Sequence, residues 1–198
     1  MQLINKFLKQ IKIKQQMKKS ILFLALATAA SVSFAQTKKI TTSATVSFDA
    51  TTKLDALPKG DNKTVVASID TKTGGVAFES TVKSFSFANP KMQEHFNSAG
   101  WMDSDKFPTA TFKGKITNLS DVKFSTDGTY SASVTGDLTI HGVTKTVTTK
   151  ASIVVSGKTI TTTSDFAIAL ADYGVNGPAI GAGKVSTDPK ITVSAEFK

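Results

Sequence analysis

The chain contains no cysteine and no arginine, and only two of its 198 residues are histidine. The lack of cysteine excludes a disulfide framework and leaves no thiolate to join a histidine in a metal site. The lack of arginine removes the residue that best makes bidentate contacts with phosphate and guanine. His95 and His141 form no HExxH motif or closely spaced pair. We therefore interpret each as fixing a local helix or turn, and we expect no metal and no cofactor.

Motifs for nucleotide binding or nucleophilic catalysis are also missing. Residues 177–184 resemble a phosphate-binding loop, but Pro178 replaces its first glycine and Val185 replaces its Ser or Thr. We interpret this segment as a flexible surface loop. No GxSxG sequence is present. Because a Ser-His-Asp triad is assembled in space, its presence is left for the tertiary structure to decide.

An export signal is expected near the N-terminus, within residues 17–36. Lys18 and Lys19 form a short positive region, an apolar run begins at Ile21, and Ser33-Phe34-Ala35 places small residues where a signal peptidase recognises them. The apolar run is shorter than the ~20 residues of a membrane span. Either Met1 or Met17 is the true start. We expect cleavage before Gln36, so that residues 1–35 are an N-terminal extension with a cleaved signal peptide and residues 36–198 are one domain.

Removal of residues 1–35 changes the charge of the chain. The whole sequence has 24 basic and 15 acidic residues, a net charge of +9. The removed part holds six lysines and no acid, which leaves 18 minus 15, or +3. This modest charge does not favour nucleic acid as a partner. Since no cysteine follows the signal for lipid attachment and no later stretch approaches ~20 apolar residues, we expect a bacterial protein that is periplasmic or secreted and not membrane-spanning.

Alternation of apolar and polar residues with period two dominates residues 36–198. This pattern is typical of strands with one buried face. It is clearest in residues 143–156, and it recurs in residues 44–50, 76–83, 110–117, 159–170 and 191–198. Threonine is abundant throughout, as expected of the outer faces of strands.

Turn residues separate these runs. Asp127-Gly128 predicts a hairpin between strands at residues 122–125 and 130–134, and three more turns are predicted at Gly74-Gly75, His141-Gly142 and Ser156-Gly157. Short turns without intervening helices imply antiparallel pairing. We therefore predict an all-β domain of about eight antiparallel strands, which can close into a barrel and so remove exposed sheet edges.

One segment interrupts the strand pattern. Asn89-Pro90 predicts the N-cap and first residue of a helix, and Gly100 is expected to end it. Met92 and Phe96 lie four residues apart and so share one face of that helix. A short helix between strands is expected to cap one end of the barrel.

Ten phenylalanines remain in residues 36–198, and most fall on the inward phase of predicted strands. Core filling is the common explanation for any one of them. An eight-stranded barrel is either filled by side chains or encloses a small ligand, and composition does not distinguish the two. The candidate cavity-lining residues lie on the inward phase, with Phe96 and Trp101 near one mouth; they are Phe48, Phe78, Val82, Phe96, Trp101, Phe112, Leu138, Ile140, Phe166 and Ile168.

Two segments carry a resemblance to a known family. The first is a predicted helix that ends in His95-Phe96, followed by a passage of the form D-x-x-K-[FY]-P-x-[AI]-x-F at residues 103–112. The second reads GDLTIHGVTK at residues 136–145. With these motifs the chain resembles the YceI-like family of exported lipid-binding proteins, over roughly residues 41–198. It departs from many members at residues 170–175, where it lacks an arginine before a Phe-Gly pair.

The resemblance implies a lipocalin-like, extended antiparallel barrel that holds a polyisoprenoid chain in its apolar interior. It implies that the ten candidate residues bind an isoprenoid or similar long-chain amphipathic lipid for transport, storage or sequestration, and that the chain is not an enzyme. Two alternatives stay open. Clustered Ser, His141 and Asp side chains facing the cavity would favour a lipid-modifying enzyme, and an interior without a pocket would favour a filled barrel that acts through its surface. A homodimer is compatible with each of these functions.

Overall fold

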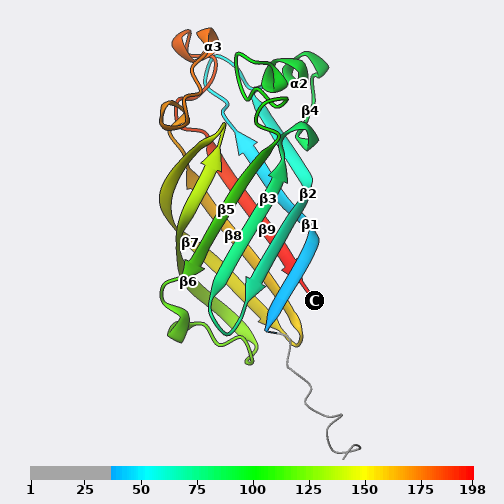
Figure 1. Ribbon diagram of the computed structural model, residues 1–198, viewed down its shortest axis with the longest axis vertical. Helices are drawn as coiled ribbons and strands as arrows, with labels where there is room; N and C mark the ends of the chain where they lie inside the picture. The colour runs from blue at the N-terminus through cyan, green and yellow to red at the C-terminus, as the bar shows by residue number, and fades with distance from the viewer. Residues whose placement is uncertain (1–36) are drawn as a thin grey trace, which may run out of the picture. The chain divides into compact units, whose positions relative to one another are not determined.

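The computed structural model describes residues 37–198, which form nine β-strands and a few short helices (Figure 1). The strands are β1 (Lys38–Asp49), β2 (Lys59–Asp70), β3 (Gly75–Thr81), β4 (Ser86–Phe87), β5 (Thr109–Ile116), β6 (Gly128–Ile140), β7 (Val143–Ser156), β8 (Thr159–Ala167) and β9 (Lys190–Phe197). Two-residue β4 pairs only with one end of β2. The other eight strands close into a ring because β1 pairs with both β2 and β9. Every neighbouring pair is antiparallel, which confirms the predicted all-β barrel.

Three of the four predicted turns are confirmed. Gly74-Gly75 joins β2 to β3, His141-Gly142 joins β6 to β7, and Ser156-Gly157 joins β7 to β8. His141 and Gly142 have φ angles of 51° and 74°. Two successive positive φ angles are typical of a type I′ turn, whose twist matches that of the flanking strands.

The predicted hairpin at Asp127-Gly128 is wrong, because residues 122–125 form no strand. β5 pairs directly with β6, and the connection between them contains the 3-10 helix η3 (Leu119–Asp121). Val122 is buried in the barrel core, and Leu119 and Phe124 pack against the same core. These apolar residues pack in and against the barrel core instead of forming a strand.

The predicted helix is present as α2 (Pro90–Asn97), in the long connection from β3 to β5. The side-chain oxygen of Asn89 accepts a hydrogen bond of 2.9 Å from the backbone N–H of Lys91, which confirms the N-cap. The helix ends at Asn97 rather than near Gly100. It ends there because Ser98 is extended, with its N–H and its hydroxyl both donating to the carbonyl of His95.

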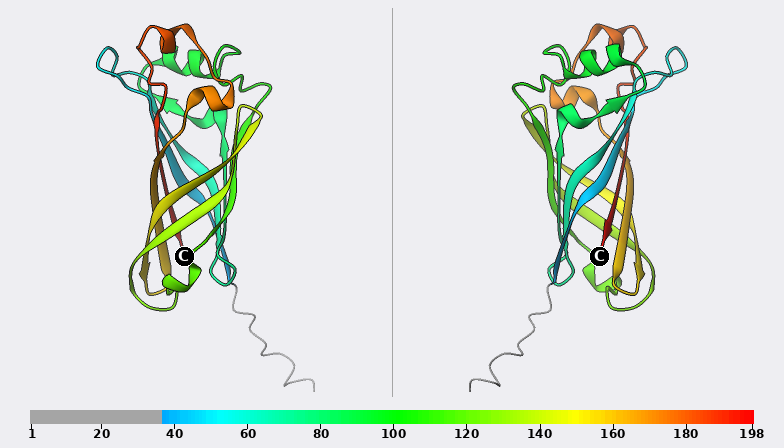
Figure 2. Two further views of the ribbon diagram at one scale, coloured as in Figure 1. Left: turned by 90° about the vertical axis from the view of Figure 1, so that its left-hand side faces the viewer. Right: turned by 90° about the vertical axis from the view of Figure 1, so that its right-hand side faces the viewer.

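Further short helices lie beside α2. The 3-10 helix η2 (Val82–Ser84) follows β3, and the connection from β8 to β9 holds η4 (Leu170–Tyr173) and α3 (Pro178–Gly181). The single turn of α3 falls within the segment predicted to be a flexible loop, with Pro178 at its first position. α2, η4 and α3 all lie at one end of the barrel, here called the cap end (Figure 2).

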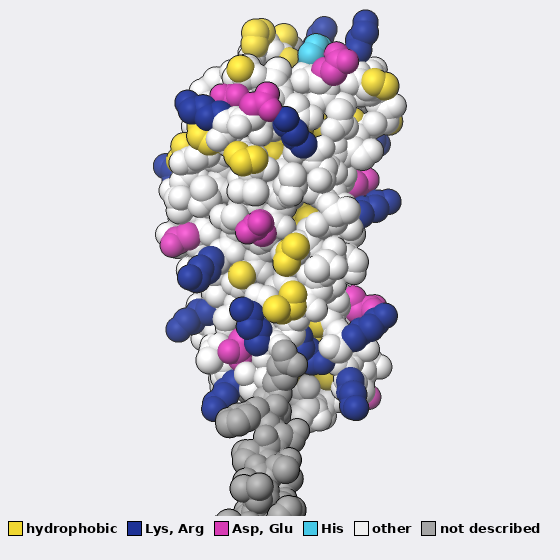
Figure 3. Space-filling view, turned by 45° about the vertical axis from the view of Figure 1, so that its right-hand side comes forward, with side chains coloured by type: hydrophobic (Ala, Val, Ile, Leu, Met, Phe, Trp, Pro, Cys, Tyr) yellow, Lys and Arg dark blue, Asp and Glu magenta, His cyan; other side chains and the backbone are white. Residues whose placement is uncertain are grey.

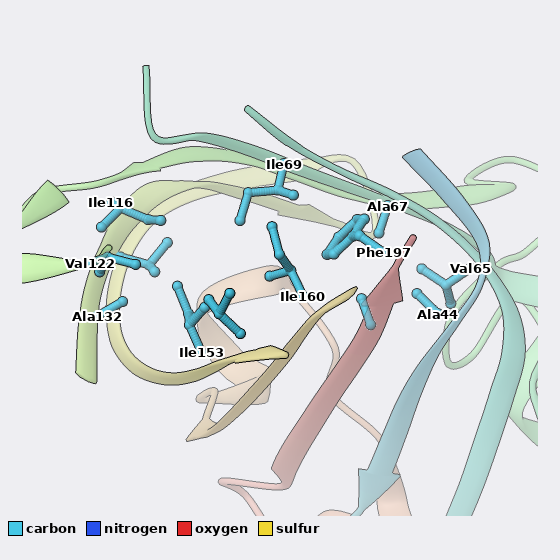
Figure 4. Close-up of a cluster of buried hydrophobic side chains, with 13 residues drawn as sticks. Ala44, Val65, Ala67, Ile69, Ile116, Val122, Ala132, Ile153, Ile160 and Phe197 are labelled. Carbon is cyan, nitrogen blue, oxygen red and sulfur yellow. The ribbon is translucent and has the colours of Figure 1, made fainter. Parts of the chain in front are cut away.

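Buried side chains form two clusters. The lower cluster lies away from the cap end and contains Ile116, Val122, Ile153, Ile160 and Phe197 (Figure 4). The upper cluster joins the barrel wall to the cap and includes Val82, Met102, Leu170, Tyr173 and Val185. The barrel is therefore filled at its lower end.

No helix within residues 37–198 is long and apolar enough to cross a lipid bilayer. The predicted signal peptide and its cleavage site lie outside the described residues.

Candidate functional site

A cavity of about 180 Å³ lies inside the barrel, here called the barrel cavity. Nine of the ten candidate residues line it: Phe48, Phe78, Val82, Phe96, Phe112, Leu138, Ile140, Phe166 and Ile168. Seven of these nine are explained by strand alternation or, for Phe96, by the predicted helix face. Val82 and Ile168 lie just beyond strand ends, in η2 and after β8, but their side chains still point inward.

The barrel cavity is lined mainly by apolar side chains, and the polar groups in its wall are hydroxyls. The hydroxyl of Ser80 accepts a hydrogen bond of 2.9 Å from the buried side chain of Asn62. The hydroxyls of Thr149 and Ser164 lie 3.1 Å apart, and Ser164 also donates to the carbonyl of Lys150 at 2.8 Å. Because these hydroxyls bond to the protein itself, the wall offers little to a charged ligand and suits a hydrocarbon chain.

Phe96 on α2 separates the barrel cavity from the cap. Its ring lies 6.0 Å from the ring of Phe48, 5.4 Å from that of Phe85 and 4.9 Å from that of Phe87, all in tilted arrangements. Such tilted aromatic contacts are favourable and hold the rings in place. The aromatic cluster therefore forms the ceiling of the barrel cavity.

A second cavity of about 290 Å³, here called the upper chamber, lies on the cap side of Phe96. It shares Phe48, Phe96, Met102 and Leu170 with the barrel cavity, so these side chains form the wall between the two spaces. Unlike the barrel cavity, the upper chamber has charged or titratable residues in its lining, namely Asp55, His95 and Lys184. A ligand that occupied both spaces would need an apolar part and a more polar part.

The tenth candidate, Trp101, lines the upper chamber and not the barrel cavity. Its ring lies against the start of α3, because a Cβ atom at Gly177 would be only 3.1 Å from Trp101 Cζ2. The structure thus brings nine candidates together and places Trp101 across the wall formed by Phe96.

Several lining residues were not among the candidates. Phe85, Met102 and Leu170 line the barrel cavity, and Phe87, Val175 and Val185 line the upper chamber. Phe85, Phe87, Met102, Val175 and Val185 lie in the segments over the cap end, where no period-two pattern was predicted. Leu170, in contrast, ends the alternating run of residues 159–170, so the signal for its inward side was available in the sequence. Other missed residues, such as Val46, Val147 and Phe197, do lie on the inward phase of strands, and that signal was available in the sequence.

His141 does not line either cavity. Its Nδ1 lies 3.1 Å from the carbonyl oxygen of Tyr173, and its ring packs edge-on against Phe107 at 4.6 Å. A carbonyl only accepts, so Nδ1 carries the proton in this bond. The contact ties the β6–β7 turn to η4, which makes it a tertiary contact rather than the local one expected from sequence. Burial, and then the charge of Asp172, raise the pKa of Tyr173.

Replacement of His141 by alanine is expected to lower the free energy of unfolding by about 2 kcal/mol, because it removes a hydrogen bond and ring packing at a residue with positive φ. His141→Asn should cost less, since asparagine tolerates this conformation in a type I′ turn. Chemical denaturation of both variants measures the difference. Full stability of His141→Ala together with loss of a bound ligand would contradict the structural role.

The residues for a hydrolytic reaction are not assembled in one place within residues 37–198. Ser68, Ser80 and Ser164 line the barrel cavity, but its lining includes no histidine and no carboxylate. The upper chamber has Asp55 and His95 but no serine. The described residues also contain no group of three or more His, Asp or Glu side chains placed to hold a metal ion.

Comparison with known proteins gives a consistent result. The family model for the YceI-like domain matches residues 24–197. A UPF0312 protein of Pseudomonas putida is 39% identical over 110 residues, which is 50% of this chain and 50% of the relative. A UPF0312 protein of Vibrio parahaemolyticus is 39% identical over 64 residues, 32% of this chain and 30% of the relative. The matched region thus spans half or less of the length of these curated relatives.

Two solved structures share the fold. A polyisoprenoid binding domain from Saccharophagus degradans, implicated in plant cell wall breakdown, superposes with a TM-score of 0.69 at 14% identity. The superposition covers 82% of this chain and 98% of that domain. BcnA of Burkholderia cenocepacia gives a TM-score of 0.65 at 21% identity, with coverage of 78% and 96%. At these identities the likeness concerns the fold.

Proposed function

The chain belongs to the YceI-like domain family, and from that premise we propose that it is a bacterial extracytoplasmic protein that binds one long-chain amphipathic lipid, of isoprenoid or similar type, in its barrel. The observation that supports this most directly is the apolar lining of the barrel cavity, with its nine inward-pointing candidate residues. The polyisoprenoid binding domain among the similar structures is described as binding such a chain, and the shared fold extends that expectation to this protein.

The size of the cavities bears on how a chain would fit. The barrel cavity, at about 180 Å³, is below the ~300 Å³ at which ligand pockets usually begin. The barrel cavity and the upper chamber together fall within the usual range. We therefore propose that the ligand spans both spaces, with its apolar chain in the barrel and its more polar end in the upper chamber. Phe96 would have to swing aside to let the chain pass.

Burial of the hydrocarbon chain supplies the main favourable free energy of binding. A buried methylene group contributes about 0.8 kcal/mol, so ten buried carbons contribute about 8 kcal/mol. The loss of ligand freedom on binding costs about 4 kcal/mol or more of this gain, so each further buried methylene raises the affinity about fourfold. Catalysis is not needed for such a role. We propose that the protein carries, stores or sequesters its lipid in the periplasm or outside the cell, where a free chain would be insoluble.

Native mass spectrometry of the protein purified without added lipid tests this function. We expect a species heavier than the polypeptide by the mass of one lipid, and loss of that mass under denaturing conditions. Solvent extraction should then release a compound with a long hydrocarbon chain. Polypeptide mass alone, together with no uptake of an added polyprenol or long-chain fatty acid, would contradict the proposal and favour a filled barrel.

A further inference from the structure

The connection between β1 and β2 carries two exposed leucines at the cap end. Leu54 is 74% exposed and Leu57 is 50% exposed. Three other large hydrophobic residues within residues 37–198 are also exposed, but they lie on strands along the barrel: Ile40, Val66 and Val154. Figure 2 shows the β1–β2 connection extending away from the barrel at the cap end. We call residues 53–57 of this connection the leucine loop.

The leucine loop is held in shape by hydrogen bonds of its own. The hydroxyl of Thr52 accepts from the backbone N–H groups of Leu54 and Asp55, at 3.1 and 3.2 Å. The carboxylate of Asp55 accepts from the N–H of Leu57 at 2.8 Å, and the carbonyl of Asp55 accepts from the N–H of Thr52. The loop therefore presents its leucines without burying them. Because these N–H groups already have partners, moving them out of bulk water costs less than it would for an open loop.

The leucine loop forms part of the rim of the upper chamber. Asp55 and the adjacent Pro58 line that chamber, whereas Leu54 and Leu57 do not. Leu54 also lies beside the connection after α3, since its Cδ1 is 3.5 Å from the Cβ position at Gly183. The exposed leucines thus stand next to the space through which a chain would enter from the cap end.

Three exposed lysines lie in or near the leucine loop. Lys53 and Lys59 flank the two leucines in sequence, and Lys59 pairs opposite Asp49 across β1 and β2. Lys184 follows the glycine that Leu54 approaches. The one acid within the loop, Asp55, is bonded to the loop backbone. Figure 3 shows, on the face in view, separate lysines and several acids, with hydrophobic groups scattered between them. Apolar side chains beside lysines are typical of protein surfaces that touch anionic lipid headgroups.

We propose that the leucine loop docks the cap end of the barrel on an anionic phospholipid bilayer. Leu54 and Leu57 enter the boundary between headgroups and acyl chains, and the nearby lysines contact the headgroups. This inference rests on the proposed function, because a protein that collects a membrane lipid must meet the bilayer with its entrance facing it. The docking is transient, since two leucines and a few lysines give far less than the anchoring of a membrane span.

Sedimentation with vesicles of phosphatidylethanolamine and phosphatidylglycerol tests the docking. The test variant is Leu54→Ser with Leu57→Ser, and the matched control is Ile40→Ser with Val154→Ser, which removes two exposed hydrophobic residues elsewhere. We expect the wild type and the control to partition onto vesicles at low salt. Both should be released by 0.5 M salt, because it shortens the Debye length to about 4 Å and so screens the exposed lysines. The test variant should partition at least tenfold less.

A second measurement separates docking from lipid binding. A fluorescent polyene fatty acid, cis-parinaric acid, is added either from ethanol solution or within the vesicles. The test variant should bind the acid from solution as the wild type does, but take it from vesicles at least tenfold more slowly. Equal partition and equal transfer rates for the test variant would overturn the docking, as would a wild type that binds the acid from solution but never sediments with vesicles. If the wild type forms dimers without vesicles and the test variant does not, the leucine loop binds a second copy of this chain instead of a bilayer. Failure of all proteins to bind the acid from solution would remove the proposed function itself.

Discussion

Replacement of Ala151 by phenylalanine is expected to abolish uptake of a lipid chain while changing the free energy of unfolding by less than about 1 kcal/mol, because the new ring would occupy cavity space rather than displace packed atoms. Ala151 lies on β7, lines the barrel cavity and is only partly buried. Its small side chain therefore faces the cavity, between those of Val147 and Ile153 on the same strand, which also line the wall.

The matched control is Ala132→Phe. Ala132 lies directly opposite Ala151 in the β6–β7 pairing, but it is fully buried in the lower cluster and does not line the cavity. The same added ring should there lower the free energy of unfolding by about 3 kcal/mol. For a domain of this size that corresponds to a fall in Tm of roughly 6–12 °C.

Thermal melting and cis-parinaric acid titration of both variants give the comparison. Retained stability with lost binding in Ala151→Phe, against lost stability in Ala132→Phe, is the expected outcome. Equal destabilisation by the two substitutions would mean that the barrel is filled at the level of Ala151, and the lipid-binding proposal would then fail.

Replacement of Gly136 by alanine is expected to lower the free energy of unfolding by about 3 kcal/mol, which is a large part of the 5–15 kcal/mol that stabilises a typical domain. Gly136 on β6 lies directly opposite Gly114 on β5. A Cβ atom at Gly136 would collide with Gly114 Cα, lie 2.5 Å from the carbonyl oxygen of Lys113 and lie 2.8 Å from Phe112 Cζ. Two of these three contacts are with backbone atoms, which cannot move without breaking strand pairing.

This glycine pair also shapes the barrel cavity. A Cβ at Gly114 would likewise lie 2.8 Å from Phe112 Cζ, so the ring of Phe112 covers both glycines. Alanine at position 136 should push that ring into the cavity and weaken chain binding as well as stability. The control is Gly181→Ala on α3, where a Cβ meets nothing within 4 Å and helix propensity predicts a small gain in stability. If Gly136→Ala has the same free energy of unfolding as the wild type in urea, β5 and β6 can move apart at this point and the prediction is wrong.

Strand positions were predictable because alternation is a local property. Val143 to Val155, for example, must place alternate side chains on one face whatever the rest of the chain does. The same reasoning placed Phe48, Phe78, Phe112, Leu138 and Phe166 on the inward side, and the structure puts all five in the wall of the barrel cavity. The cap of α2 was predictable for a similar reason, since Asn89 and Pro90 act on the first turn of the helix alone.

The predicted strand at residues 122–125 was wrong because a short apolar run is compatible with more than one structure. Val122 and Phe124 satisfy a strand pattern, but β6 pairs with β5 and leaves them no partner strand. Val122 is buried in the lower cluster instead, and the half-buried Phe124 packs against that cluster. Which of the two outcomes occurs depends on the pairing of segments far apart in sequence, and that pairing is not encoded in the run itself.

By itself, the sequence determined the all-β class, most of the barrel strands, the position of the capping helix and the inward face of most cavity residues. Only the tertiary structure decided that His141 bonds to Tyr173 outside both cavities, that Trp101 and Phe96 face an upper chamber, and that the interior is packed below and open above. The physical reason is the distance along the sequence over which each effect acts. Alternation and capping act over a few residues, whereas the volume left inside a barrel depends on how eight strands and the connections over its ends pack together.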